Sequence, residues 1–169
     1  SVTDLQGRIT GAHRTWLAPD GSAKAAVPTP RRAMGNLLGH AVRFGAAEDV
    51  LAVGEGIETM LSLRAALPGM PMAAALSASH LAALRLSPSV RRLYIARDVD
   101  AAGTTAAATQ AELATSAGIE GLTLSPRHGD FNDDLTAHGV DDLRAAIRPQ
   151  IAPEDVDRFL LKGAARSCS

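Results

Sequence analysis

The sequence predicts an α/β protein in which a four-stranded parallel sheet is flanked by helices and preceded by a small β-hairpin region. From residue 49 onward, short apolar segments alternate with Ala- and Leu-rich segments of helical length. Repeated βα units of this kind form parallel sheets with right-handed crossovers. Before residue 49, turn signals and prolines separate short segments. We therefore divide the chain into a β-rich N-terminal region (1–48), an α/β domain (49–148), and a C-terminal helix and tail (149–169).

The composition is typical of a globular protein. Of the 169 residues, 46% are hydrophobic and only 3% are aromatic, so we expect a core of Ala, Leu, Val and Ile. The single cysteine, Cys168, excludes an intrachain disulfide and a cysteine-rich zinc site. No apolar run approaches the roughly 20 residues that span a bilayer, and the N-terminus lacks a signal-peptide pattern. We expect a cytoplasmic protein without a membrane partner.

The net charge of −1 conceals an asymmetry between the two halves of the chain. Residues 1–92 carry ten Lys or Arg against six Asp or Glu, whereas residues 93–169 carry seven against twelve. This is either ordinary surface charge, or a basic half that holds a polyanion beside an acidic half that holds metal. The candidates for nucleic-acid contact are Lys24, Arg31, Arg32 and Arg43. For the adjacent arginine pair, a solvated loop is the plainer alternative.

The N-terminal region is predicted to contain a β-hairpin. Residues 8–16 and 24–27 flank the Ala-Pro-Asp-Gly sequence of residues 18–21, which is a strong turn signal. The prolines of residues 27–32 predict a loop or linker. Residues 40–44 are predicted to form a further strand that pairs with the hairpin.

The α/β domain is predicted to contain four strands and four helices. Four short apolar segments are expected to be strands: residues 50–53, 72–76, 92–96 and 119–124. Residues 50–53 and 93–96 are expected to be buried. Composition and capping signals predict helices after each of the four strands, at residues 57–67, 77–84, 102–117 and 141–147. Beyond the domain, Pro153 and the acidic residues that follow it predict one more helix, over residues 153–162.

Three of the predicted strands are followed closely by groups of carboxylates: Glu55 and Glu58, then Asp98 and Asp100, then Asp130, Asp133 and Asp134. Ligands of open parallel sheets bind outside the carboxyl ends of the strands, so we expect these groups to share one site. Asp98 and Asp100 are two residues apart in extended chain and would face the same side. Two like charges so close are costly unless a cation neutralises them, and oxygen ligands suit Mg²⁺ or Mn²⁺.

Three motifs carry a resemblance to a known family. They are Val53-Gly54-Glu55-Gly56-Ile57-Glu58-Thr59, Asp98-Val99-Asp100-Ala101-Ala102-Gly103 and Gly129-Asp130-Phe131-Asn132-Asp133. In this order, each after a predicted strand, they resemble the motifs of the Toprim domain. Bacterial-type primases, type IA and type II topoisomerases, certain nucleases and recombination mediator proteins share that domain. The resemblance is to the phage- and plasmid-type primases and primase-helicases in particular, and covers roughly residues 49–138.

The resemblance implies a Toprim-like Rossmannoid fold with two bound Mg²⁺ or Mn²⁺ ions. Glu55 matches the family's glutamate, which acts as a general acid or base and helps to hold metal. Asp98 and Asp100 match the metal-binding pair, and these three residues would be catalytic. Asp130 matches the late aspartate that helps to hold a second metal. The residues expected to support these ligands are Glu58, Asn132 and Asp133.

Two positions depart from the family's pattern. Gly129 stands where related sequences often have a lysine before the late aspartate. Arg97 precedes the aspartate pair, where small residues are common. Contacts between nucleotide phosphates and these two positions are therefore not carried over.

Each carboxylate also has a structural interpretation. Glu55 could be a turn residue beside a helix N-terminus, and one of the two aspartates of the second motif could cap a helix and pair with Arg97. In the third motif, Asn132 or Asp133 could be a helix N-cap.

The resemblance implies metal-dependent nucleotidyl transfer, and our leading hypothesis is RNA primer synthesis on single-stranded DNA by the Toprim part of a plasmid- or phage-type primase. The partners would be the single-stranded template and nucleoside triphosphates. Because the chain has no P-loop, a helicase domain or protein is a further expected partner. A Toprim-type DNA nuclease and a non-catalytic nucleic-acid-binding module stay open. A topoisomerase is disfavoured, since the only tyrosine, Tyr94, lies in a predicted buried strand.

Overall fold

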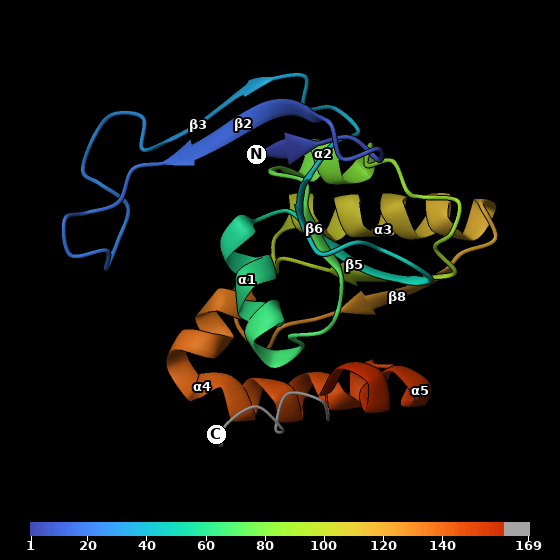
Figure 1. The fold of residues 1–169 in the computed structure, drawn as a ribbon. Helices are drawn as coiled ribbons and strands as arrows, with labels where there is room; N and C mark the ends of the chain where they lie inside the picture. The colour runs from blue at the N-terminus through green and yellow to red at the C-terminus, as the bar shows by residue number, and fades with distance from the viewer. Residues whose placement is uncertain (161–169) are drawn as a thin grey trace, which may run out of the picture.

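The chain forms two β-sheets of different character (Figure 1). The computed structural model describes residues 1–160. The first sheet is antiparallel, with three strands in the order β1-β2-β3: Val2–Thr3, Ile9–Thr15 and Arg31–Gly35. The second has five strands in the order β4-β6-β5-β7-β8: Val42–Phe44 (β4), Met72–Ala74 (β6), Val50–Gly54 (β5), Arg92–Ala96 (β7) and Glu120–Leu124 (β8).

Four strands of the second sheet, β6, β5, β7 and β8, are parallel, and helices cover both of its faces. The helices are α1 (Ile57–Ala66), α2 (Ala78–Ala82), α3 (Ala101–Ser116) and α4 (Phe131–Ile147). Figure 1 shows α1 and α4 on one face, and α2 and α3 on the other. The predicted class, a parallel sheet flanked by helices and preceded by a small antiparallel sheet, is confirmed.

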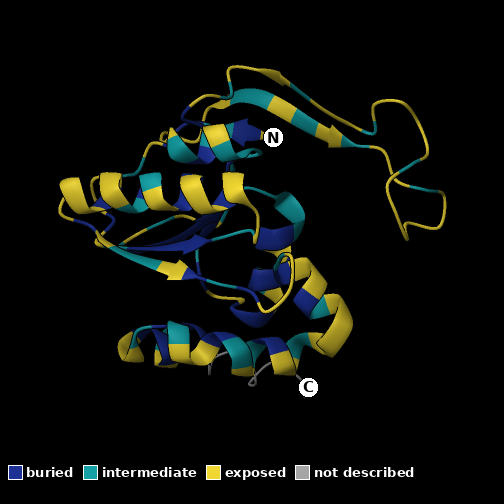
Figure 2. Ribbon diagram, turned by 180° about the vertical axis from the view of Figure 1, so that it is seen from behind, coloured by how far each residue is buried: buried dark blue, intermediate teal, exposed yellow. Residues whose placement is uncertain are grey.

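Burial on both faces explains the apolar composition of the central strands (Figure 2). All five residues of β5 are buried, and so are four of the five residues of β7. The buried side of α3 carries mostly alanine and glycine, so the helix can lie close to the sheet. Within residues 1–160, no helix combines the length and the apolar character needed to cross a lipid bilayer.

The predicted hairpin is wrong in its second strand. Residues 18–21 do form a turn, in which the Gly21 N–H donates to the Ala18 carbonyl at 2.8 Å. However, β2 pairs with Arg31–Gly35 and not with residues 24–27, which contribute only an isolated bridge at Lys24. Pro28 and Pro30 have no N–H to donate, so a ladder resumes only beyond them. Arg31 and Arg32 therefore lie in a strand and not in the predicted loop.

The predicted partner of residues 40–44 is also wrong. The strand is shorter, β4, and pairs antiparallel with β6, with Val42 opposite Ala74 and Phe44 opposite Met72. The larger sheet thus gains an antiparallel edge strand that the sequence did not predict. Just before β4, Ala41 bridges to Thr3 of β1, so this segment links the two sheets.

Two helical segments differ from the prediction. α4 begins ten residues before the predicted 141–147, at Phe131, and contains a break at Gly139, whose φ is 80°. Polar residues fill its first half, which hides the helix from a search for apolar periodicity. The predicted helix at 153–162 is a helical turn, α5 (Pro153–Asp155), followed by a wider turn over Val156–Leu160. Residues 161 and 162 lie outside the described residues.

The C-terminal segment is held against the amino end of β7 by a fully buried carboxylate, Asp155. Its Oδ2 accepts hydrogen bonds from Arg92 and from the Tyr94 hydroxyl, both at 2.8 Å. The Tyr94 oxygen in turn accepts the N–H of Ala152 at 3.0 Å. Burial, together with the neighbouring Asp155, raises the pKa of Tyr94 above its ordinary value. The tyrosine is therefore structural, and it has no exposed surface from which to act as a nucleophile.

Candidate functional site

Carboxylates gather where three neighbouring parallel strands end. β5 pairs with β7, and β7 with β8, so their carboxyl ends lie along one edge of the sheet. From β5 the chain goes to β6 on one side, and from β6 it crosses back to β7 on the other side of β5. Such a reversal of strand order opens a crevice for ligands. Glu55 follows β5 directly, Asp98 lies two residues past β7, and Asp130 lies beyond the end of β8.

A pocket of about 810 Å³ occupies this edge of the sheet. Its acidic wall consists of Glu55, Glu58, Asp98, Asp130 and Asp133, with Asn132 beside them. A second wall comes from the loop between β2 and β3 and from the start of β3, and it contributes Lys24 and Arg31. The structure therefore brings residues from the two halves of the chain to one pocket, with opposite charges facing it.

Asp98 lies at the centre of the acidic wall. Its carboxylate is half-buried, and the buried oxygen Oδ1 has no hydrogen-bond donor among residues 1–160. Burial raises the pKa of Asp98 to about 6, with further contributions from the charges of Glu55 and Asp130 and smaller ones from Asp100 and Asp133. A buried anionic oxygen without a donor is costly, and a cation is the group that would satisfy it.

Glu55 lies in the turn after β5, close enough to Asp98 and Asp100 for their charges to interact. Burial raises its pKa, the charge of Asp100 raises it further, and the backbone N–H of Ala78 acts in the opposite direction. The turn is fixed to the next loop, because the Leu76 N–H donates to the Glu55 carbonyl at 2.8 Å. Leu76 lines the pocket with a φ of 81°, a backbone conformation that a residue with a branched side chain rarely adopts.

Asp100 is exposed and caps α3. Its side chain accepts the N–H of Gly103 at 2.6 Å, so the N-cap interpretation of the second motif is correct for this residue. A Cβ at Gly103 would lie 3.0 Å from the carbonyl oxygen and 3.1 Å from the Cβ of Asp98, so glycine lets α3 begin close to Asp98 without a shift of either. Asp100 does not line the pocket, but it raises the pKa of both Glu55 and Asp98 and is therefore close enough to act on the site through its charge.

Asp130 is both a helix cap and part of the acidic wall. Its Oδ1 accepts the N–H groups of Asn132 and Asp133 at 2.7 and 2.8 Å, so the N-cap of α4 is Asp130 and not either of the two residues predicted. Its Oδ2 accepts the hydroxyl of Thr59, from α1, at 3.4 Å. Capping thus occupies one oxygen and leaves the other turned toward α1 and the pocket.

Sequence reasoning missed two residues of α1 that reach the third motif. The Thr59 hydroxyl contacts Asp130, and the Ser62 hydroxyl lies 3.3 Å from Oδ1 of Asn132. Thr59 lies within the first motif, which is the only sequence signal for its role. Ser62 follows Thr59 at helical spacing on the same side of α1, and this spacing could have indicated it.

A buried carboxylate holds the loop before Asp130. Asp134 is 1% exposed and accepts the backbone N–H groups of Arg127 and His128, as well as Nδ1 of His128 at 2.6 Å. Burial alone would raise the pKa of Asp134, but these hydrogen bonds outweigh it and hold the pKa below its ordinary value. In the same loop, a Cβ at Gly129 would meet Oδ2 of Asp133 at 2.6 Å, a contact that a rotation of the Asp133 side chain would relieve.

Two of the four predicted basic residues line the pocket, Lys24 and Arg31. Arg31 forms an ion pair with Glu58 at 2.5 Å. Burial would raise the pKa of Glu58, but its own backbone N–H and Arg31 together lower it. The structure does not bring Arg32 or Arg43 to the pocket. Arg43 is partly buried on β4, where burial lowers its pKa and the charge of Asp4 raises it.

The donor set fits Mg²⁺ or Mn²⁺, because every charged group on the acidic wall is a carboxylate. Within residues 1–160, no three such side chains already form a cage around one ion position. Mg²⁺ does not need one, since it is usually held by one or two carboxylates, water molecules and the phosphates of a substrate. The unsatisfied Oδ1 of Asp98 is the atom that best fits this role.

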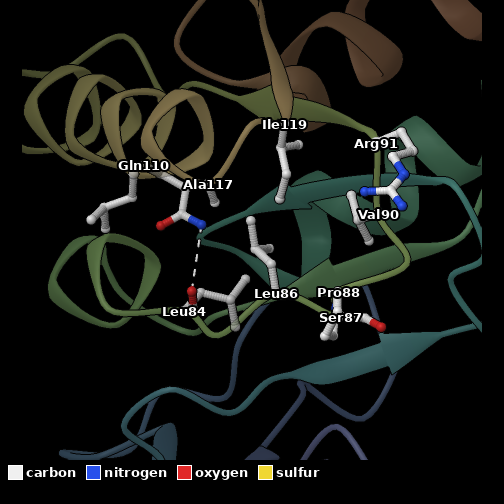
Figure 3. Close-up of a pocket in the computed structure, with 10 residues that line it drawn as sticks. Leu84, Leu86, Ser87, Pro88, Val90, Arg91, Gln110, Ala117 and Ile119 are labelled. Carbon is white, nitrogen blue, oxygen red and sulfur yellow. Dashed lines mark hydrogen bonds between the residues drawn. The ribbon is translucent and has the colours of Figure 1, made fainter.

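A second pocket, of about 490 Å³, lies at the opposite end of the sheet (Figure 3). It is mainly apolar, and Leu86 and Ile119 are among the side chains that line it. Gln110, on α3, lies at its wall and directs its amide nitrogen to the Leu84 carbonyl at 3.5 Å. No carboxylate of the described chain lines this pocket, whereas five carboxylates line the acidic pocket.

Two family profiles match the chain. The profile described as a Toprim domain matches residues 50–141, which include the three acidic motifs. A profile described as a domain of unknown function (DUF7146) matches residues 1–44, which include the three-stranded sheet. No functionally curated protein matches.

The solved structures that are similar to this chain include two from bacterial primases. The Aquifex aeolicus primase (zinc-binding and RNA polymerase domains) aligns with a TM-score of 0.60 and 20% identity, over 88% of this chain and 38% of that one. A DNA primase domain from Pseudomonas aeruginosa aligns with a TM-score of 0.58 and 22% identity, over 87% of this chain and 49% of that one. The chain thus spans less than half the length of either structure, and at these identities the likeness shows a common fold.

Proposed function

We propose that this chain, which belongs to the Toprim domain family, catalyses metal-dependent nucleotidyl transfer and makes RNA primers on single-stranded DNA. The observation that carries the proposal is the environment of Asp98. Four neighbouring carboxylates act on this side chain, and one of its oxygens is buried without a donor. The similarity in fold to bacterial primase domains supports the choice of primer synthesis.

Each carboxylate has a distinct proposed task. Asp98, Asp100 and Asp130 would hold the divalent ions, which supply charge neutralisation at the reacting phosphates and at the pyrophosphate that leaves. Glu55 would accept the proton of the attacking 3′-hydroxyl, and its raised pKa makes it a stronger base than an ordinary glutamate. Glu58, Asn132 and Asp133 would support these groups from the rim of the pocket.

The basic wall of the pocket would bind the anionic substrates. Lys24 and Arg31 face the carboxylates across the pocket and would contact the triphosphate of the incoming nucleotide or the template backbone. Arg32 and Arg43, which do not line the pocket, would contact the template only outside it. A helicase domain or partner protein that exposes single-stranded template would complete the system.

Primer synthesis tests the proposal directly. Single-stranded DNA, ribonucleoside triphosphates and Mg²⁺ or Mn²⁺ are expected to yield short RNA products, and the Asp98→Asn, Asp100→Asn double variant is expected to yield none. Asp141→Asn is a matched control, because this carboxylate is 91% exposed, pairs with Arg144 and does not line the pocket. If the double variant made primers at the wild-type rate, the assignment of the metal site would be wrong.

A second candidate function is DNA hydrolysis. Gly129 replaces the lysine that related sequences often have beside the late aspartate, and this removes a cation that could bind a nucleotide triphosphate. The same carboxylates could hold metal for the activation of water. Degradation of DNA without added nucleotides would favour the nuclease. DNA binding at full strength in EDTA, without either activity, would favour a non-catalytic binding module.

A further inference from the structure

Two arginines lie directly opposite each other on the β2–β3 ribbon. The register pairs Arg14 with Arg32, and cross-strand partners point to the same face. Both side chains are exposed, and neither forms an ion pair with a carboxylate of residues 1–160. Like charges in this position destabilise a sheet, so the pair is best explained by an anion that lies between them.

Exposed apolar side chains flank the two arginines on the same face. Trp16 lies two residues beyond Arg14 and is 52% exposed. The Arg14 guanidinium stacks over the Trp16 indole ring, 5.0 Å from the ring centroid. Met34 lies two residues beyond Arg32 and is 57% exposed. We call the surface formed by Arg14, Trp16, Arg32 and Met34 the outer strip. It combines cations, which bind phosphate, with a flat aromatic surface, which stacks on bases. A nucleic acid therefore suits this surface better than a small inorganic anion does.

The outer strip is distinct from the acidic pocket. The opposite face of the ribbon carries His13 and Arg31, and Arg31 is the residue that pairs with Glu58 and lines the pocket. No residue of the outer strip lines that pocket. Figures 1 and 2 show the ribbon extending from the body of the molecule. All four residues of the outer strip are exposed.

The charge of the ribbon identifies the kind of partner. Residues 9–35 contain four Lys or Arg and one Asp, whereas the whole chain has a net charge of −1. The ribbon is therefore a basic element on an otherwise acidic protein, and it is complementary to a polyanion. A duplex would offer phosphates but would keep its bases stacked inside, whereas a single strand offers both phosphates and free bases.

We propose that the outer strip binds single-stranded DNA, with Trp16 stacked on a base and Arg14 and Arg32 in contact with the flanking phosphates. This inference deepens the proposed function, because it gives the template strand a path on the outside of the ribbon. Met34 extends the apolar surface for a neighbouring base. Arg31 and Lys24, on the pocket side, serve the substrate inside the pocket.

Trp16 is the only tryptophan of the chain, so tryptophan emission reports on the outer strip alone. The experiment titrates the whole chain with an oligothymidylate in EDTA, without nucleotides, so that neither metal nor catalysis contributes. We expect saturable quenching of the emission by the single strand and much weaker quenching by a duplex of the same length. Unchanged emission at concentrations that saturate a labelled oligothymidylate would overturn the proposal, as would a complete lack of binding.

Two variants test the individual roles through the fluorescence anisotropy of a labelled oligothymidylate. Trp16→Ala is expected to weaken binding by roughly 5- to 150-fold, the range typical of a lost base stack. Arg14→Gln combined with Arg32→Gln is expected to make the slope of log K against log salt shallower by about 1.4, since each phosphate contact to a single strand contributes about 0.7. Arg91→Gln is the matched control, because Arg91 is exposed and lies just before β7 in the five-stranded sheet. This variant should change neither the affinity nor the salt dependence. Wild-type affinity and slope in the double arginine variant would overturn the proposal.

The test also separates the strip from the catalytic proposal. The Asp98→Asn, Asp100→Asn variant is expected to quench as the wild type does, because the strip does not use the carboxylates. Quenching in a chain that makes no primers would therefore support the strip and contradict only the proposed activity. Primer synthesis that is insensitive to Trp16→Ala and to the arginine variants, with no quenching, would contradict only the strip.

Discussion

The backbone N–H of Val99 donates to the carbonyl oxygen of Gly129 at 2.9 Å. This bond joins the loop that carries Asp98 to the loop that carries Asp130. The two carboxylates are therefore held near each other by the backbone, although their charges repel. The free energy stored in this repulsion is available to a cation that binds between them, and it makes the site measurable through stability.

The first prediction concerns Asp98 and pH. Its folded-state pKa of about 6 lies above the ordinary value of 3.8, so the folded state holds the proton more tightly than the unfolded state does. The resulting contribution to stability is complete below pH 3.8 and is lost as the pH rises through about 6. In EDTA, Asp98→Asn should therefore be more stable than the wild type at pH 7.5, by about 1 kcal/mol after allowance for solvent screening, and less so at pH 5.

Denaturant unfolding of both proteins at the two pH values measures this difference. The Asp141→Asn variant should show no such pH-dependent gain, because its carboxylate is exposed. A gain from Asp98→Asn that is equal at pH 5 and pH 7.5 would contradict the environment described for Asp98.

The second prediction concerns metal. Addition of Mg²⁺ or Mn²⁺ at millimolar concentration should raise the melting temperature of the wild type, because an ion that binds only the folded state stabilises it by mass action. The increase should disappear in Asp98→Asn and persist in Asp141→Asn. Differential scanning fluorimetry in EDTA and in each metal measures it, and an equal increase in all three proteins would show that the ions bind elsewhere.

The third prediction concerns Asp134. Asp134→Ala removes the acceptor of three hydrogen bonds from Arg127 and His128, and two of the donors are backbone N–H groups of the loop before Asp130. We expect a loss of about 2–3 kcal/mol in the free energy of unfolding at pH 7. The loss should diminish in acid, because a carboxylate with a lowered pKa contributes stability above its ordinary pKa and loses it as the pH falls. Asp133→Ala, one position earlier, should cost less stability because no residue within 1–160 donates a hydrogen bond to its carboxylate; an equal cost would contradict the role of Asp134.

The fourth prediction separates structure from catalysis at Tyr94. Tyr94→Phe deletes the hydroxyl that donates to Asp155 and accepts from Ala152, so we expect a loss of about 1–3 kcal/mol in unfolding free energy. Metal binding and DNA binding should be unchanged below the melting transition. Loss of either function in the folded variant would mean that the tyrosine reaches the site, contrary to its complete burial.

The fifth prediction concerns the pocket side of the ribbon. Arg31→Ala breaks an ion pair with Glu58 in which both side chains are partly exposed, so stability should change by less than about 1 kcal/mol. If Arg31 contacts a phosphate of the substrate, the KM for the nucleotide should rise by about fivefold with kcat little changed. Arg91→Ala is the control, and steady-state primer synthesis is the measurement.

The central strands could be predicted from the sequence because their environment is uniform. β5 and β7 are buried on both faces, and such strands are continuous apolar runs. They can be recognised without knowing which strands they pair with. The partner of β2 could not be predicted in this way. Residues 24–27 and 31–35 are both short and mostly exposed, so no buried face specifies the register, and the choice depends on Pro28 and Pro30.

The acidic wall was predictable for a related reason, since parallel strands bring their carboxyl ends to one edge. Glu55, Asp98 and Asp130 do line one pocket. The contact between Thr59 and Asp130 was not predictable, because it depends on how closely α1 approaches the start of α4. The placement of Arg43 away from the pocket likewise follows from the pairing of β4 with β6, which no local pattern of the sequence encodes.

The contacts of Asp155 and Arg158 have a consequence for folding during synthesis. Asp155 binds Tyr94 across 61 residues of chain, and Arg158 binds Asp49 across 109. At a translation rate of about 5–20 residues per second, roughly 3–12 seconds pass between the synthesis of β7 and the synthesis of Asp155 and Arg158. A nascent chain that ends before Asp155 lacks the acceptor of Tyr94 and one of the carboxylates that pair with Arg92, so the docking of the C-terminal segment onto β7 follows the synthesis of the whole sheet.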